Sequence, residues 1–502
     1  YLWMSCKNCG TRQNEVSVTK IYSHSVRLSG PDAGTSINLE NVQKSTSSAS
    51  CSNKESYSDK ALCSEKMQRS DKALCSDKAL YSDEALRSDE APRSDKAIDI
   101  VDAFCVLQKG FTDQFVYYDK ERVNRYMGLG RCIAIPSLES ADFILQGDET
   151  CHPIMFSFNR FDASNPKPAD DMMASFPKVR LMVPELVLIE NEKGSFLQVN
   201  SLGPVYSGRV NRFIRHILQA KPRTHRDMPY TLSLDSFEDW QRVMDCGLGK
   251  IRTHRIEKFV PSRRIYLKTD QPFSSKDLLV NLIDGDARGC VFMYRYGDVF
   301  FCGCTPELLV RKEGTTVESM CLAGTTSCGE TEAEKEERAQ ALMADDKNRR
   351  EHEFVVSFMR DVFGRNCYNV SIPRNPSIKA LRHVQHLCTP VSAQVMEGRS
   401  LLSLASQLHP TPALSGTPVG EAMMTLREAE SYNRGFFGGA IGYVDGAGDG
   451  EFSVAIRSGV FDGEAGWLYA GCGVVEGSNA RDEFDEIDLK LKTILSAFSA
   501  PQ

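Results

Sequence analysis

The sequence lacks several features that would place it in other protein classes. It has no apolar run of about 18 residues, the length that a membrane-spanning helix needs. Its beginning lacks the charged, apolar and small-residue order of a secretory signal. It also has no excess of basic residues, since the formal net charge is −7, whereas phosphate contacts normally need a basic face. We therefore expect a soluble intracellular protein with no membrane and no nucleic acid among its partners.

Nucleotide-binding and disulfide signatures are missing as well. No GxGxxG opens a βαβ unit, and no GxxxxGK[ST] loop is present, which argues against a nucleotide fold. The 17 cysteines are scattered and odd in number, which favours reduced thiols over a disulfide framework. Cys6 and Cys9 have the spacing of a zinc knuckle, but no second pair lies near them. We expect no metal there.

The beginning of the chain differs from the rest. Residues 51–98 form a degenerate six-residue repeat, with copies such as YSDKAL, CSDKAL and RSDEAP. A period of six matches neither a helix nor a strand, so no continuous apolar face forms. We predict that residues 1–99 are a disordered extension. Because the chain starts at Tyr1, a targeting peptide could have been lost, and the location could be the cytoplasm or an organelle such as a plastid.

The remainder, residues 100–499, has the composition of a folded catalytic domain. A β-rich part at residues 100–234 contains runs such as FVYY, CIAI, PIMFSF, VRLMV and ELVLIE, followed by a helix through residues 213–218. In residues 235–499, strands such as RRIYL, VFMYRY, DVFFCG, AIGYV and WLYAGCGVV mix with helices. The pattern predicts an α+β fold with large antiparallel sheets.

Two predicted helices carry carboxylates beside their apolar faces. In residues 478–498, Glu483, Glu486 and Lys490 follow the edge of an apolar stripe at helical spacing. Taken alone, this pattern also fits a solvated flank with a salt bridge from Glu486 to Lys490. In KNRREHEFVVSFMRDVF, Glu351 continues a buried stripe, where a carboxylate is costly unless it is paired or binds a cation. Together the two helices offer oxygen ligands suited to Mg²⁺.

The segments around these helices carry a family resemblance. In order along the chain they are TPELLVRK, LAGT, VQHLCT, LHPTPALSGTP, EAESYNRGFFGGAIGYVDGAGDGEFSVAIRSG and YAGCGVV. This series resembles the chorismate-utilising enzymes, which include isochorismate, anthranilate, aminodeoxychorismate and salicylate synthases. The strong match spans residues 258–498, and a weaker one reaches back to about residue 100. The resemblance implies two large antiparallel sheets packed as a sandwich, with helices on the outside.

The resemblance also implies a set of site residues. Mg²⁺ would be bound by Glu351 and Glu483, with Glu486 nearby or acting through water, and would hold the ring carboxylate of chorismate. Asn348 departs from relatives that have a further acidic residue there. Arg457 would bind the enolpyruvyl carboxylate through its planar fork. Further substrate-binding positions implied by the resemblance are Thr325, His386, Ala413, Leu414, Phe437, Gly471, Gly473 and Lys490.

Four positions indicate which reaction of the family to expect. Lys258, in EKFVPSR, matches the lysine that acts as general base on water, where ammonia-using relatives typically have glutamine. Glu307, in TPELL, matches the general acid that protonates the departing C4 hydroxyl. Ala323 stands where aminodeoxychorismate synthases use a nucleophilic lysine. Ala413 matches the isochorismate synthase pattern, whereas relatives that aminate the ring or eliminate pyruvate tend to carry threonine.

These positions predict an isochorismate synthase. Phe437 supports this prediction, because relatives that eliminate pyruvate tend to have tyrosine there. The alternatives are a salicylate synthase, an anthranilate synthase component I and a catalytically inactive relative. The lack of an LLES-type tryptophan-binding segment disfavours the anthranilate synthase, while the repeat tract and the departures at Cys321 and Cys328 from common family residues give slight support to the inactive relative. Ser415 is a further departure, and all three bear on substrate affinity more than on the type of reaction. We expect a monomer with chorismate as substrate and no glutamine amidotransferase subunit. Quinone (menaquinone or phylloquinone), salicylate and siderophore pathways all start from isochorismate.

Overall fold

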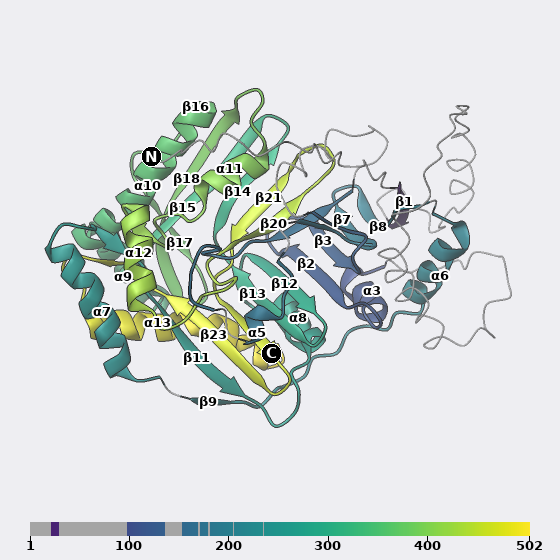
Figure 1. Ribbon diagram of the computed structural model, residues 1–502, viewed down its shortest axis with the longest axis horizontal. Coiled ribbons are helices and arrows are strands. Elements are labelled where there is room, and N and C mark those ends of the chain that lie inside the picture. Colours follow the sequence, from purple (N-terminus) through teal and green to yellow (C-terminus); the bar gives the residue numbers. More distant parts are fainter. Residues whose placement is uncertain are drawn as a thin grey trace, which may run out of the picture.

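The computed structural model describes residues 22–29, 98–135, 153–168, 171–178, 181–203, 205–233 and 235–501. Nearly all of the hexapeptide repeats and the Cys6 and Cys9 pair lie outside these ranges. The described chain forms two large antiparallel sheets and one small one, with helices around them (Figure 1).

The larger sheet has eleven described strands, which all pair antiparallel. In spatial order they are β1 (Tyr22–Ser29), β8 (Gly194–Ser201), β7 (Leu186–Asn191), β3 (Arg125–Leu129), β2 (Asp113–Asp119), β12 (Cys290–Tyr296), β13 (Val299–Thr305), β22 (Ser458–Asp462), β23 (Ala465–Gly471), β11 (Ser262–Lys268) and β9 (Thr231–Ser233). The sheet therefore joins the β-rich part before residue 235 to the motif-bearing part after it.

The second sheet has ten described strands. Its main path is β16 (Cys367–Ser371), β18 (Val384–Val395), β15 (Thr316–Ser327), β14 (Leu308–Glu313), β21 (Gly450–Val454), β20 (Ala440–Val444), β5 (Met155–Phe158), β6 (Leu181–Val183) and β4 (Ile133–Ile135), and β17 (Ser377–Ala380) pairs with β18. A small third sheet consists of β19 (Gly416–Thr417), β10 (Lys258–Phe259) and β24 (Val474–Val475).

Helices cover the outer faces of the sheets. They are α3 (Ile100–Leu107), α5 (Asp171–Ala174), α6 (Ser207–Leu218), α7 (Phe237–Arg252), α8 (Ser275–Asp284), α9 (Glu332–Ala344), α10 (Asp346–Asn366), α11 (Leu401–Leu408), α12 (Val419–Ala429), α13 (Ala480–Leu495) and the 3₁₀ turn η3 (Ser496–Phe498). Side-chain caps begin several of them; Asp345, for example, accepts from the backbone N–H of Asn348 at the start of α10. Helix α10 packs on β15, and α13 packs on β23.

An aromatic layer fills the space between the two large sheets. Phe115 of β2 stacks on Phe156 of β5 with ring centroids 5.5 Å apart. Tyr117 donates a hydrogen bond to Glu451 of β21 over 2.6 Å, so the polar end of the ring is satisfied across the interface. Every residue of β2 is buried because one of its faces meets this layer and the other packs in the main hydrophobic core, which also contains α3. The predicted α+β class with two large antiparallel sheets is confirmed.

One prediction about the beginning of the chain is wrong for eight residues. Tyr22–Ser29, inside the segment predicted to be disordered, form β1 and pair with the edge strand β8. Val26 and Leu28 are buried, whereas Ser25 and Arg27 are exposed. This alternation is typical of a strand with one buried face, and the pairing satisfies the free backbone groups along β8.

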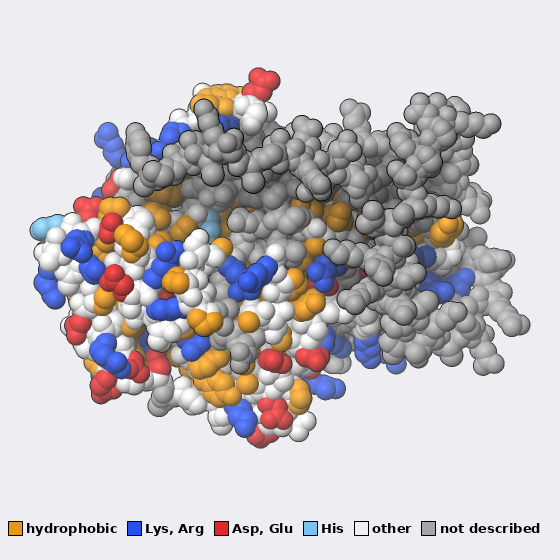
Figure 2. All heavy atoms as spheres, viewed as in Figure 1, with side chains coloured by type: hydrophobic (Ala, Val, Ile, Leu, Met, Phe, Trp, Pro, Cys, Tyr) orange, Lys and Arg blue, Asp and Glu red, His pale blue; other side chains and the backbone are white. Residues whose placement is uncertain are grey.

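No helix in the described ranges is long and apolar enough to cross a membrane. Lysine, arginine, aspartate and glutamate side chains are interspersed over the described part of the face in Figure 2.

Candidate active site

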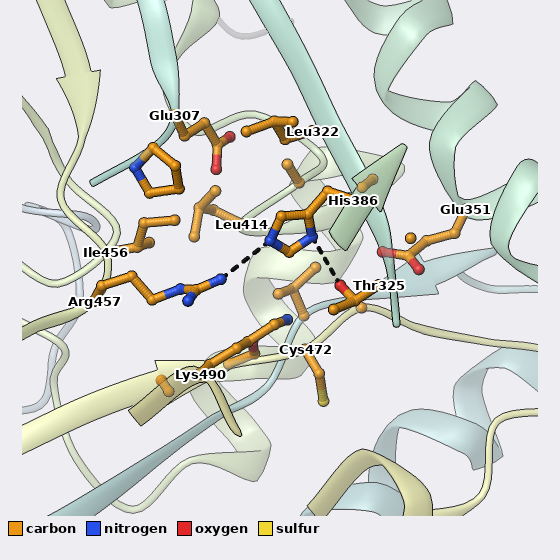
Figure 3. Close-up of a pocket in the computed structure, with 18 of the residues that line it drawn as sticks. Glu307, Leu322, Thr325, Glu351, His386, Leu414, Ile456, Arg457, Cys472 and Lys490 are labelled. Carbon is orange, nitrogen blue, oxygen red and sulfur yellow. Dashed lines mark hydrogen bonds between the residues drawn. The ribbon is translucent and has the colours of Figure 1, made fainter. Parts of the chain in front are cut away.

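A cavity lies among β15, β18, β23, α10 and α13, at the loops that join β13 to β14 and β21 to β22 (Figure 3). Most of the site residues predicted from the sequence line it: Glu307, Thr325, Glu351, His386, Ala413, Leu414, Phe437, Arg457, Gly471, Gly473 and Lys490. Apolar side chains such as Leu322 and Ile456 complete the lining. Segments more than 150 residues apart in sequence thus meet at one polar cavity with apolar walls.

Arg457 lies in this cavity as a buried guanidinium without a carboxylate partner among the described residues. Its Nη1 donates to Oγ1 of Thr493 and its Nη2 donates to Nε2 of His386, each over 3.1 Å. Burial lowers the pKa of Arg457 to about 10, so it remains charged at neutral pH. Its backbone φ of 54° is uncommon for a residue other than glycine. The arrangement presents to an anionic ligand a positive charge that has no direct carboxylate partner within the described residues.

His386 links Arg457 to Thr325, as the dashed lines of Figure 3 show. A guanidinium only donates, so Nε2 of His386 accepts from Arg457 and Nδ1 carries the proton. This proton is donated to Oγ1 of Thr325 over 3.1 Å. Burial, followed by the charge of Arg457, lowers the pKa of His386 well below its usual value, so the ring is neutral. Thr325 keeps its own hydroxyl proton for another acceptor.

Glu307 supplies a buried carboxyl group to the same cavity. Its side chain has no hydrogen-bond or ion-pair partner among the described residues. Burial raises the pKa of Glu307 to about 7, although Lys258, Lys490 and Arg457 act in the opposite direction. A carboxylic acid that keeps its proton near neutral pH can act as a general acid.

Lys258 lies just behind the lining. It belongs to β10, which pairs with β19 and β24, and its side chain is fully buried. Its Nζ lies 3.1 Å from Oε1 of Glu351, but this contact does not have the geometry of a hydrogen bond, and Nζ has no other hydrogen-bond partner among the described residues. A Cβ at Gly473 would collide with the Glu351 carboxylate and lie 3.1 Å from Cε of Lys258. A side chain at position 473 would therefore require the Glu351 carboxylate or the backbone to move.

The other two predicted metal ligands lie on α13 and are paired with different lysines. Oε1 of Glu483 lies 2.7 Å from Nζ of Lys347, and Oε1 of Glu486 lies 2.6 Å from Nζ of Lys490. Burial and then the like charge of Glu486 raise the pKa of Glu483. The sequence pattern also fitted a salt bridge between Glu486 and Lys490, and the structure contains this salt bridge.

The charges of Glu351, Glu483 and Glu486 all act on Lys347, which lies at the start of α10. Within the described ranges, no three histidine, cysteine, aspartate or glutamate side chains lie close enough together to hold a metal ion. Binding of Mg²⁺ by Glu351 and Glu483, with Glu486 nearby or acting through water, stays a prediction, and each of these three carboxylates lies beside a lysine. The donors still fit Mg²⁺ in chemistry, since this ion takes oxygen ligands, often only one or two carboxylates, and retains several waters.

Three further residues of α10 contact the site, and the sequence did not reveal their contacts. Asn348 accepts from the backbone N–H of Thr325 over 3.2 Å. His352 contacts the carbonyl oxygen of Ala323 and the hydroxyl of Thr389, and Lys347 reaches Glu483. One signal was available, because Lys347, Asn348, Glu351 and His352 fall at i, i+1, i+4 and i+5 and so share one side of a helix.

Comparison with known proteins defines the class of this chain. A family model described as chorismate binding enzyme matches residues 134–499. The chain belongs to this family. It is 33% identical to isochorismate synthase MenF of Bacillus subtilis (strain 168) over 355 residues, which cover 69% of this chain and 74% of that protein. It is also 33% identical to isochorismate synthase DhbC of the same organism, over 52% of this chain and 67% of that protein.

The fold is shared with solved structures of the family. The structure of MenF, the menaquinone-specific isochorismate synthase from Escherichia coli, superposes with a TM-score of 0.69 at 22% identity, over 80% of this chain and 92% of that one. Anthranilate synthase component I from Streptococcus pneumoniae TIGR4 superposes with a TM-score of 0.59 at 18% identity, over 88% and 100%. Proteins named for different reactions thus share this fold, so the fold alone does not define the reaction.

Proposed function

We propose that the protein is an isochorismate synthase, which converts chorismate to isochorismate. Water adds at C2 of the ring, the double bonds shift, and the C4 hydroxyl leaves as water. The observation that carries the proposal is Glu307, a buried carboxyl group with a pKa of about 7 in a cavity that also presents the unpaired Arg457 guanidinium. A dicarboxylate that loses a hydroxyl group requires these two features, a cation for its charge and an acid for its leaving group.

The proton transfers are assigned to two side chains. Lys258, in its neutral form, takes a proton from the attacking water as the new bond forms at C2. Glu307 gives its proton to the hydroxyl group as the bond to C4 breaks. One proton is taken up and one is released, so the reaction is an isomerisation that needs no redox partner. The full burial of Lys258 keeps bulk water away from this amine.

Carboxylate recognition is assigned to Arg457, with the backbone N–H groups of Gly471 and Gly473 beside it. Ala413, Leu414 and Phe437 form an apolar wall for the ring. Glu351 and Glu483 would hold Mg²⁺, with Glu486 acting through water. When bound, this ion would neutralise the ring carboxylate and so favour addition of a nucleophile to the ring. The small side chain of Ala323 leaves no nucleophilic amine at that position.

The experiment is incubation of the purified chain with chorismate and Mg²⁺, followed by separation and mass identification of the products. We expect isochorismate without added lyase. Salicylate as the main product would replace the proposal with a salicylate synthase, and anthranilate formed only with ammonia would replace it with an amine-using enzyme. Lack of any product, with correct folding shown by circular dichroism, would favour a catalytically inactive relative.

A further inference from the structure

Strand β15 is interrupted at the edge of the cavity by a bulge at Ala323–Gly324–Thr325. The pairing of β15 with β18 shifts register between Ala323 and Thr325. Gly324 has φ +77°, and a Cβ there would lie 3.2 Å from the side chain of Asn348. Bulges re-aim side chains and leave backbone groups of the ladder unpaired. Here the bulge places Thr325 in the cavity, where its hydroxyl meets His386.

Helix α10 supplies hydrogen-bond partners to the backbone of the bulge at two points one helical turn apart. Oδ1 of Asn348 accepts from the N–H of Thr325 over 3.2 Å. The Asn348 amide is held in this orientation because its Nδ2 donates to Oδ1 of Asp345 over 2.8 Å. An aspartate at position 348 would place a second carboxylate against Asp345. The hydrogen-bond pattern therefore requires an amide.

The second point is His352, which is buried. Its Nδ1 lies 3.2 Å from the carbonyl oxygen of Ala323, which can only accept, so Nδ1 carries the proton. Its Nε2 then accepts from the hydroxyl of Thr389 on β18 over 2.8 Å. His352 thus ties together both strands that flank the bulge.

We propose that Asn348 and His352 are positioning residues that clamp the β15 bulge and thereby hold Thr325 in the geometry that receives substrate. The role of Thr325 as a substrate contact rests on the proposed function. The clamp itself is inferred from the hydrogen bonds of Asn348 and His352 and does not depend on the proposed function. Glu351 lies between the two clamp residues on the same helix and also lines the cavity, so the clamp fixes the bulge relative to this carboxylate.

The test uses the full chain with Asn348→Ala and His352→Leu, which each remove one contact, and His352→Asn, which restores a donor near the position of Nδ1. Asn366→Ala is the matched control, because Asn366 is a buried residue at the far end of α10 that bonds to Val362 and Gln407, away from the cavity. Hydrogen exchange of the peptide that contains residues 321–327, followed by mass spectrometry, reports on the bulge without any assay of activity.

We expect faster exchange of this peptide in Asn348→Ala and His352→Leu, and no change in Asn366→Ala. With chorismate, kcat/KM should fall about 10- to 100-fold in both clamp variants, because a displacement of about 1 Å at a site costs on the order of 100-fold. His352→Asn should recover most of this loss. The double variant should lose less than the product of the two single losses, since both residues act on one bulge.

Unchanged exchange in both clamp variants would overturn the proposal. So would losses of kcat/KM in Asn366→Ala as large as those in the clamp variants, because that result would indicate general destabilisation. If the wild-type chain neither binds nor converts chorismate, the proposed function fails, while the exchange measurement still decides whether the clamp exists.

Discussion

Nη2 of Arg457 donates to Nε2 of His386 over 3.1 Å, and this one contact fixes the direction of hydrogen bonding across the cavity. Because the guanidinium only donates, the histidine must donate from Nδ1 to Thr325. The threonine hydroxyl then offers its own proton to a ligand. Burial and the charge of Arg457 keep His386 neutral. The Arg457 guanidinium and the Thr325 hydroxyl can therefore both contact the same substrate, and the histidine between them adds no charge.

Replacement of Arg457 tests the recognition of a carboxylate. We expect Arg457→Lys to raise KM for chorismate about 10-fold or more, because an ammonium group cannot make the planar two-point contact of a guanidinium. The measurement is steady-state kinetics supported by calorimetric binding. Arg427→Lys is the control, since Arg427 pairs with Asp162 through two short contacts outside this cavity. Equal changes in KM for both variants would contradict the assignment.

The pH dependence of the rate tests Glu307. Burial raises the pKa of Glu307 to about 7, and the proposed acid works only while protonated. The rate should therefore fall as the pH rises above about 7. Glu307→Gln should lower kcat by about 100- to 10,000-fold and remove this alkaline limb from the remaining activity. An unchanged limb in the glutamine variant would assign it to another group.

Stability provides an independent test of the same carboxyl group. Its pKa rises from 4.5 to about 7 on folding, so the native state binds this proton more tightly than the unfolded chain does. The contribution of Glu307 to the free energy of unfolding is complete below about pH 4.5 and is lost as the pH rises to about 7. The glutamine side chain in Glu307→Gln cannot ionise, so the free energy of unfolding of this variant does not fall in the same way. In urea unfolding, the free energy of unfolding of the variant relative to that of the wild type should be higher at pH 8 than at pH 5. The absence of this increase would contradict the raised pKa of Glu307.

The sequence predicted the class of the fold and most of the cavity lining, because both depend on local patterns. Short β-rich runs predicted β2 and β12, and short motifs around Glu307 and Gly473 carried the family resemblance. The strand Tyr22–Ser29 was missed, since its apolar positions are few and its stability depends on the free edge of β8, which sequence alone does not reveal.

The long-range ion pairs of the site could not be predicted from the sequence. The pairing of Lys258 with Glu351 joins residues 93 positions apart, and that of Lys347 with Glu483 joins residues 136 apart. Such pairings depend on how helices and strands pack, not on spacing along the chain. The contacts of Asn348 and His352 with the β15 bulge have the same origin, because the register shift that exposes those backbone groups is a property of the sheet.

Gly473 offers a test of the crowded contact beside Lys258. Gly473→Ala would push its methyl group into the Glu351 carboxylate, so either the glutamate or the backbone must shift. We expect a loss of about 100-fold in kcat/KM. Gly364→Ala is the control, because Gly364 lies in α10 with open space around it. This control should keep its activity and gain about 0.5–1 kcal/mol in the free energy of unfolding. Activity in Gly473→Ala equal to that of the control would show that the site tolerates the methyl group.

Metal binding tests the carboxylates that are paired with lysines. EDTA treatment should abolish turnover, and Mg²⁺ should restore it. Mn²⁺ binding followed by electron paramagnetic resonance gives a readout without turnover, and we expect Glu351→Gln and Glu483→Gln each to weaken it about 10-fold or more, because each removes a charged oxygen ligand. Glu353→Gln is the matched control, since Glu353 lies on the exposed side of α10 and contacts Ser357 and Arg360.

Lys347 pairs with the carboxylate of Glu483 over 2.7 Å. The variant Lys347→Met should therefore leave that carboxylate free and strengthen Mn²⁺ binding. Equal Mn²⁺ affinity in the wild type and in all four variants would place the ion elsewhere in the protein.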